Sequence, residues 1–156
     1  WDERTEQYYL HSFLKEQPDL NWRNAAVREA MFDVLRFWLS RGASGAGVDG
    51  VRIDVAHYCL KDPALRDNPP APADGGTFHK SMGAYDSLMH VHDKGHPDVH
   101  ELFRQMRALF DDVSAKTGRE RVMVGEIHEF DWTTWASYYG TGVRGGGAGG
   151  ANADDT

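Results

Sequence analysis

Two acidic residues lie where they could form a catalytic carboxylate pair. Asp54 and Glu126 each come near the end of a short apolar segment, 48–55 and 122–127, of the type that forms parallel strands. The carboxyl ends of such strands carry the functional sites of α/β sheets and barrels. If the strands are neighbours, about 4.8 Å apart, the carboxyl groups would approach the roughly 5–5.5 Å spacing of a retaining glycosidase pair. One carboxylate would then attack while the other donates a proton.

Arg52 lies two residues before Asp54 and therefore on the same face of the expected strand. Its fixed positive charge is expected to keep Asp54 ionised and oriented, and to leave the more distant Glu126 freer to hold a proton. Such different environments would make Asp54 the nucleophile and Glu126 the acid. The same residues also fit a structural ion pair beside an unrelated glutamate, and spacing alone favours that structural interpretation.

Four histidines are concentrated in one stretch, namely His90, His92, His96 and His100. The last three are spaced by four residues, which aligns metal ligands only on a continuous helix, and Gly95 and Pro97 interrupt such a helix. We therefore expect solvated histidines, with no metal ion and no cofactor. The single cysteine, Cys59, is expected to be a small buried hydrophobe rather than a nucleophile.

Two helices are expected to position these residues. Asn24 can cap the first, and Arg41–Gly42 can end it. Its expected buried stripe, with Phe37 also assigned to packing, consists of Val27, Met31, Val34, Leu35 and Trp38. The second helix is expected from near Pro97 to Gly118, with an apolar stripe made of Val99, Leu102, Phe103, Met106, Leu109, Phe110 and Val113.

The strand expected at 48–55 alternates apolar side chains, Val55 among them, with Arg52 and Asp54 on the opposite face. A second strand is expected at 122–127, after the second helix. A helix between two strands returns the chain to the same edge of a sheet. The order helix, strand, helix, strand therefore predicts α/β architecture with a parallel sheet.

Composition excludes several classes of partner. The chain has 156 residues, 40% of them hydrophobic, and a net charge of -7, which fits one globular domain. This acidity argues against nucleic acid, whose binding depends on clustered cations. No stretch reaches the roughly 18 apolar residues of a membrane span. One cysteine favours a reducing, cytoplasmic compartment. The Gly-rich residues 141–156 are expected to be a disordered tail after a domain at 1–140.

Three motifs resemble those of the α-amylase superfamily, glycoside hydrolase family 13. Residues 50–57 (GVRIDVAH) are similar to its strand-four motif, in which the aspartate is the nucleophile and the arginine two positions earlier is nearly constant. Residues 124–127 (VGEI) resemble its strand-five motif, which carries the general acid/base. Residues 17–21 (QPDLN) are similar to a motif typical of α-glucosidase and oligo-1,6-glucosidase members. The resemblance covers roughly residues 5–140.

This resemblance implies a retaining, exo-acting α-glucosidase on a (β/α)8 barrel, with a short oligosaccharide as substrate. Asp54 would attack the anomeric carbon, Glu126 would protonate the leaving oxygen and later activate water, and Arg52 would orient Asp54. Val55 and His57 of the same motif are the expected substrate-binding residues. Val55 also matches members that accept α-1,6 linkages.

The chain departs from the family pattern in three respects. Residues 43–47 are inserted before the first strand, and the Gly-rich tail does not resemble the family's continuation. A barrel needs about 250 residues, whereas this chain would span roughly helix 3, strand 4, helix 4 and strand 5. The family's third catalytic carboxylate has no counterpart in it. We therefore expect a barrel fragment that is inactive or nearly so.

Alternatives stay open at this stage. Trehalose synthase and other transglycosylases of the superfamily share these motifs, and a non-catalytic binding or transport-associated module could keep the same scaffold. A sheet of only two strands would also leave both edges and much apolar surface uncovered. We therefore expect marginal stability or self-association through those edges.

Overall fold

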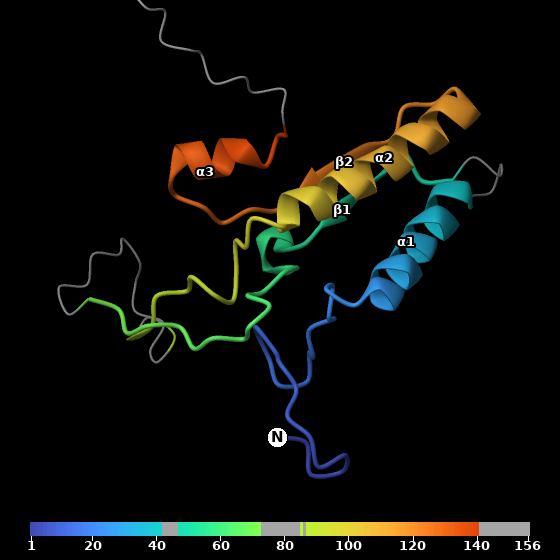
Figure 1. Ribbon diagram of the computed structural model, residues 1–156. Coiled ribbons are helices and arrows are strands. Elements are labelled where there is room, and N and C mark those ends of the chain that lie inside the picture. The colour runs from blue at the N-terminus through green and yellow to red at the C-terminus, as the bar shows by residue number, and fades with distance from the viewer. Residues whose placement is uncertain (42–46, 73–84, 86, 141–156) are drawn as a thin grey trace, which may run out of the picture.

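The computed structural model describes residues 1–41, 47–72, 85 and 87–140. Its elements in chain order are α1 (Ala25–Ser40), β1 (Gly50–Ile53), the 3-10 turn η1 (Ala56–Tyr58), α2 (Val99–Thr117), β2 (Val122–Gly125) and α3 (Trp132–Ser137). In Figure 1, α2 packs against both α1 and β2. The expected tail at 141–156 and nearly all of the insertion at 43–47 lie outside the described residues.

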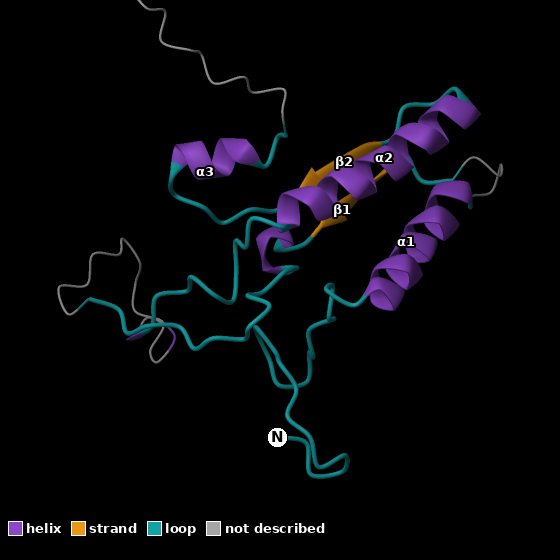
Figure 2. Cartoon of the chain, viewed as in Figure 1, coloured by secondary structure: helices purple, strands orange, loops and turns teal. Residues whose placement is uncertain are grey.

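The two strands pair in parallel, as predicted. Gly50 lies opposite Val122, and Ile53 lies opposite Gly125. Because α2 connects β1 to β2 and packs on β2, the predicted α/β arrangement is confirmed for this unit. Figure 2 shows that the loops following β1 and β2 leave the sheet at one shared end. Side chains just beyond the two strands are therefore brought together.

Both strands are shorter than the sequence pattern predicts. β1 ends at Ile53 because Val55 has a φ of 37°, in the left-handed region, and begins the η1 turn. A β-branched residue rarely adopts this conformation. The expectation that Val55 lies on the apolar face of the strand is therefore wrong. The backbone turns at Val55, so Asp54 lies between the last residue of β1 and this turn.

The predicted start of α1 at Asn24 and the predicted end of α2 at Gly118 are confirmed. The side chain of Asn24 accepts a hydrogen bond from the backbone N–H of Ala26 at 2.9 Å, which satisfies a free donor at the start of α1. Gly118 ends α2 with a φ of 66°. This left-handed conformation suits glycine, which has no Cβ to clash with the backbone.

The predicted stripe of α1 is only partly correct. Phe32 and Leu39 are its buried residues, whereas Val34, Phe37 and Trp38 are exposed. The helix packs against α2, and Phe32 belongs to the core that forms there. The assignment of Phe37 and Trp38 to packing is therefore wrong in this structure.

The main core lies around α2 and consists of Phe32, Leu60, Val99, Leu102 and Met106. It joins α1, the loop after η1 and the first half of α2. Of the expected stripe on α2, Val99, Leu102, Met106 and Phe110 are buried. Across the described part of the chain, no helix has the length and apolar character needed to cross a bilayer.

Candidate active site

Asp54 and Glu126 directly follow the last residues of β1 and β2. Those last residues, Ile53 and Gly125, are paired in the sheet. Both carboxylates therefore lie just beyond the C-terminal ends of the two strands, at neighbouring positions. Arg52 contacts both, with Nη1 2.7 Å from Asp54 Oδ1 and Nη2 2.8 Å from Glu126 Oε2. The expected contact with Asp54 is present. The expectation that Arg52 is more distant from Glu126 is wrong, because one guanidinium joins both acids.

The two carboxylates have different surroundings. Asp54 has a side chain 70% exposed, whereas that of Glu126 is 28% exposed. Glu126 Oε2 accepts a hydrogen bond from the backbone N–H of Val55 at 3.2 Å, and Glu126 Oε1 lies 3.2 Å from His128 Nε2. The Val55 N–H is the main cause that lowers the pKa of Glu126, with Asp54, His128 and Arg52 acting in the same direction. The expectation that Glu126 holds a proton more readily is therefore wrong for this state.

The turn at Val55 explains how Glu126 acquires its backbone donor. The backbone N–H of Ala56 donates to the carbonyl of Glu126, and the N–H of Glu126 donates to the carbonyl of Ile53, each at 2.9 Å. These bonds hold the turn against the end of β2. No sequence signal indicated the Val55 donor, because a left-handed valine is not an expected feature. His128 could have been found, since it lies only two residues after Glu126.

His57 is buried inside the protein. It is 3% exposed, and neither ring nitrogen has a hydrogen-bond partner among the described residues. Its ring centroid is 4.7 Å from that of Tyr58 and 6.0 Å from that of His128. Burial is the main cause that lowers its pKa from 6.5 to about 4, so the ring is neutral at pH 7. Its assignment as a substrate-binding residue stays a prediction.

A pocket of about 270 Å³ lies beside Asp54. One wall comes from the segment before α1 and the other from the turn after β1, and the lining consists of Ser12, Phe13, Gln17, Pro18, Asp19, Leu20, Trp22, Asp54, Val55, Tyr58 and Cys59. The lining combines aromatic rings with groups that can hydrogen-bond to hydroxyls. Sugar rings bind in such settings, because their faces stack on aromatic rings and their hydroxyls need polar partners.

Comparison with known proteins identifies the family. A model of the α-amylase catalytic domain matches residues 1–148. The chain belongs to the α-amylase family. It is 41% identical over 118 residues to a probable α-glucosidase of Rhizobium meliloti (strain 1021), covering 74% of this chain and 20% of that protein. It is 34% identical over 140 residues to the human amino acid transporter heavy chain SLC3A1, covering 90% of this chain and 19% of that protein.

A solved structure shows the same likeness. The crystal structure of the α-glucosyl transfer enzyme XgtA matches with a TM-score of 0.71 and 38% sequence identity, over 86% of this chain and 24% of that one. This chain thus spans about a fifth to a quarter of the length of these three proteins. The α-amylase catalytic domain implies a (β/α)8 barrel, and β1–α2–β2 is a parallel unit of the kind that builds one.

The histidine stretch of this α-amylase family member has separate local partners. His90 Nδ1 lies 2.7 Å from Asp93 Oδ2, and His100 Nε2 lies 3.4 Å from Ser137 Oγ. Within the residues that the structure describes, no three His, Cys, Asp or Glu side chains gather closely enough to hold a metal ion. Burial raises the pKa of the Cys59 thiol to about 11, which disfavours the reactive thiolate.

Proposed function

We propose that this chain carries the nucleophile and the acid/base of a retaining α-glucosidase that acts on terminal α-glucosidic bonds of short oligosaccharides. Asp54 is the nucleophile, Glu126 is the acid/base and Arg52 orients both. One observation carries the proposal: a single guanidinium contacts two carboxylates at the carboxyl ends of neighbouring parallel strands. The membership of the α-amylase family and the likeness to a probable α-glucosidase support it.

The proposed reaction has two steps. In the first, an oxygen of Asp54 attacks the anomeric carbon while the bond to the leaving oxygen breaks and Glu126 gives that oxygen its proton. In the second, Glu126 takes a proton from water, and the water oxygen displaces Asp54 from the sugar. Glu126 must be protonated before the first step. A sugar that removes water from the site raises the pKa of Glu126 by desolvation and opposes the Val55 donor.

The complete reaction requires more of the barrel than the β1–α2–β2 unit. A (β/α)8 barrel needs about 250 residues, and we propose that the two carboxylates act within a protein of that size or larger. The isolated 156-residue chain is expected to hydrolyse no more nitrophenyl α-glucoside than its Asp54→Asn variant does. Substantial turnover that Asp54→Asn abolishes would contradict this expectation.

A chimera tests the proposal directly. The segment of the Rhizobium relative that aligns with this chain is replaced by the matching residues of this chain. The chimera is expected to hydrolyse maltose and nitrophenyl α-glucoside. Asp54→Asn is expected to reduce both activities by about four orders of magnitude or more. Asp112→Asn, an exposed aspartate on α2, is the matched control and is expected to leave both unchanged.

Glu126→Gln separates the two roles. It is expected to slow maltose hydrolysis by about 10²–10⁴-fold, the usual loss when a general acid is removed. The formation of the glycosyl-enzyme from nitrophenyl α-glucoside is expected to be less affected, because nitrophenolate leaves without a proton. Equal losses for both substrates in this step would assign Glu126 another role. An Asp54→Asn chimera with full activity would refute the carboxylate pair altogether.

Two other functions are supported by single observations. The likeness to an α-glucosyl transfer enzyme favours transfer to a sugar acceptor in place of water, by the same covalent intermediate. Product analysis with maltose separates them, because transfer yields longer saccharides or an isomer while hydrolysis yields glucose alone. The likeness to a transporter heavy chain favours a non-catalytic module. The presence of Arg52, Asp54 and Glu126 together supports the enzyme over that module.

A further inference from the structure

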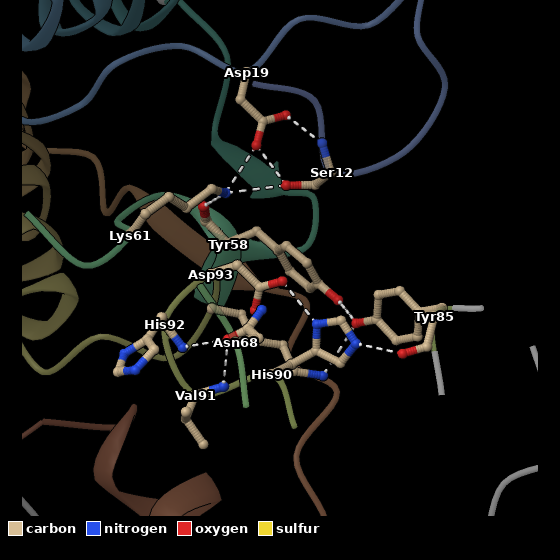
Figure 3. Close-up of polar contacts among 11 residues, drawn as sticks. Ser12, Asp19, Tyr58, Lys61, Asn68, Tyr85, His90, Val91, His92 and Asp93 are labelled. Atoms are coloured by element: carbon tan, nitrogen blue, oxygen red, sulfur yellow. Dashed lines mark hydrogen bonds and ion pairs between the residues drawn. The ribbon is translucent and has the colours of Figure 1, made fainter. Parts of the chain in front are cut away.

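A partly buried ionic cluster joins two segments that are far apart in the sequence. Lys61 Nζ lies 2.8 Å from Asp19 Oδ2 and 3.1 Å from Ser12 Oγ, and it donates to the carbonyl oxygen of Tyr58. Asp19 also accepts hydrogen bonds from the backbone N–H and hydroxyl of Ser12. Figure 3 shows Lys61 between Asp19 and Tyr58. All three donor positions of the ammonium are therefore occupied.

This ion pair is far less exposed than the Lys116–Asp112 pair on α2. The side chains of Lys61 and Asp19 are 13% and 21% exposed, whereas those of Lys116 and Asp112 on α2 are 71% and 57% exposed. Burial alone would raise the pKa of Asp19, but the hydrogen bonds from Lys61 and Ser12 outweigh it and hold that pKa below its ordinary value. Exposed pairs contribute little to stability, while loss of one partner from a buried pair leaves an unpaired charge.

Three members of the cluster, Ser12, Asp19 and Tyr58, line the pocket beside Asp54, whereas Lys61 is outside that lining. Ser12 and Asp19 belong to the wall formed by residues 12–22, and Tyr58 belongs to the facing wall. Lys61 contacts side chains of the first wall and the backbone of the second. The Phe13 ring contacts the Tyr58 ring at 5.3 Å between centroids, which adds an apolar contact between the same walls.

We propose that Lys61 is a positioning residue that holds residues 12–20 against the turn after β1 and thereby sets the width of the pocket beside Asp54. It touches no reacting atom and acts through Asp19, Ser12 and the Tyr58 carbonyl. The aromatic rings and hydrogen-bonding groups in the lining suit a sugar, and this assignment of the occupant rests on the proposed function.

Hydrogen exchange of the sugar-free chain tests the positioning role independently of any activity. Lys61→Met keeps the length of the side chain and removes its charge. The backbone amides of Ser12 and Asp19, which are bonded to Asp19 and to the carbonyl of Leu10, are expected to exchange about tenfold faster or more. The amides of α2 are expected to be unchanged. Lys116→Met removes an exposed lysine that is also paired with an aspartate, Asp112, and is expected to leave all of these exchange rates unchanged.

Two further variants keep the test decisive. Lys61→Arg retains the charge and is expected to recover part of the lost protection. If Lys61→Met also exposes α2, Ser12→Ala is measured in its place. It removes the hydroxyl that contacts Lys61 and donates to Asp19, and it leaves the ion pair between Lys61 and Asp19. Ser12→Ala is then expected to speed exchange at Asp19 alone. The proposal is overturned if the exchange rates of Ser12 and Asp19 are unchanged in Lys61→Met. It is also overturned if the exchange rate of Asp19 is unchanged in Ser12→Ala.

Maltose binding to the same proteins tests the occupant. If the chain binds maltose, Lys61→Met is expected to weaken the affinity about tenfold or more while Lys116→Met does not. Equal affinity in Lys61→Met and the unsubstituted chain overturns the role of Lys61 in setting the pocket. If no variant binds maltose while Lys61→Met still accelerates exchange, the assignment of the pocket to a sugar fails. The positioning role is then supported without it.

Discussion

At the scale of single residues, Arg52 joins the two carboxylates through one guanidinium. The backbone N–H of Val55 is the main cause that lowers the pKa of Glu126, and Arg52 acts in the same direction. Glu126 therefore requires a change in its surroundings before it can act as an acid, and a bound sugar supplies that change in the proposed reaction.

A pH dependence of stability is predicted for His57. Its pKa falls from 6.5 to about 4 on folding, so the unfolded chain binds this proton more readily between those values. The free energy of unfolding should therefore decrease as the pH falls from 6.5 to 4, by up to about 1.4 kcal/mol per pH unit from this residue. Urea unfolding of the chain and of His57→Phe measures the difference.

Carboxylates also titrate toward the acid end of this range, so only the difference between the two proteins reports on His57. His11→Gln, which changes an exposed histidine, is the control and should keep the slope of the original chain. An identical slope in His57→Phe would show that the buried ring does not titrate as predicted.

At the scale of elements, close approach of the strands depends on a glycine. A Cβ at Gly50 would lie 2.5 Å from the carbonyl oxygen of Val122, and backbone cannot move away as a side chain can. Gly50→Ala is therefore expected to destabilise the chain by about 1–3 kcal/mol. Gly125→Ala is the matched control, because its nearest neighbour would be the Ala56 Cβ at 3.5 Å, an ordinary contact. Urea unfolding compares them, and equal effects would contradict the prediction.

The start of α1 and the end of α2 were predictable, because the capping residues Asn24 and Gly118 act through local chemistry that the sequence displays. Strand length was not predictable in the same way. The apolar alternation continues through Val55, whereas the bonds that Val55 and Ala56 donate to Glu126, and the bond from the Tyr58 N–H to the Val55 carbonyl, hold this residue in the turn. Burial of Trp38 was also predicted wrongly, since periodicity shows which residues are apolar but not which side of a helix is covered.

The candidate active site, like the fold, was predictable only in part. Parallel pairing of β1 and β2 brings Asp54 and Glu126 to one edge, as their positions in the sequence indicated. The contact between Arg52 and Glu126 was missed, because it depends on the strand register and on side-chain reach. Lys61 was missed as well, since its partner Asp19 is far away in the chain.

At the scale of the whole molecule, the described surface is rich in exposed apolar groups. Val122 and Val124 of β2 are 49% and 59% exposed, and Trp132 on α3 is 77% exposed. In the described part of the chain, the sheet has two strands, so each has an unpaired edge. Such edges and apolar patches promote association.

The isolated chain is therefore predicted to associate with itself as its concentration rises. Val124→Lys is expected to reduce this association, because a charge on a strand at the sheet edge opposes pairing with another strand. Ala30→Lys adds the same charge at an exposed position on α1 and should leave association unchanged. Sedimentation over a concentration series measures both. A chain that stays monomeric throughout, or variants that behave alike, would contradict this prediction.

The hydrogen bond from the Val55 N–H to Glu126 means that the two acids do not vary independently. A substitution of Glu126 that removes the side-chain acceptor leaves the N–H next to Asp54 without this partner, while the backbone bonds of Ala56 and Glu126 still hold the turn. Glutamine at position 126 would keep an oxygen for the Val55 N–H and lose the acidic proton, whereas alanine would lose both, so the two substitutions separate the local bend from the chemistry.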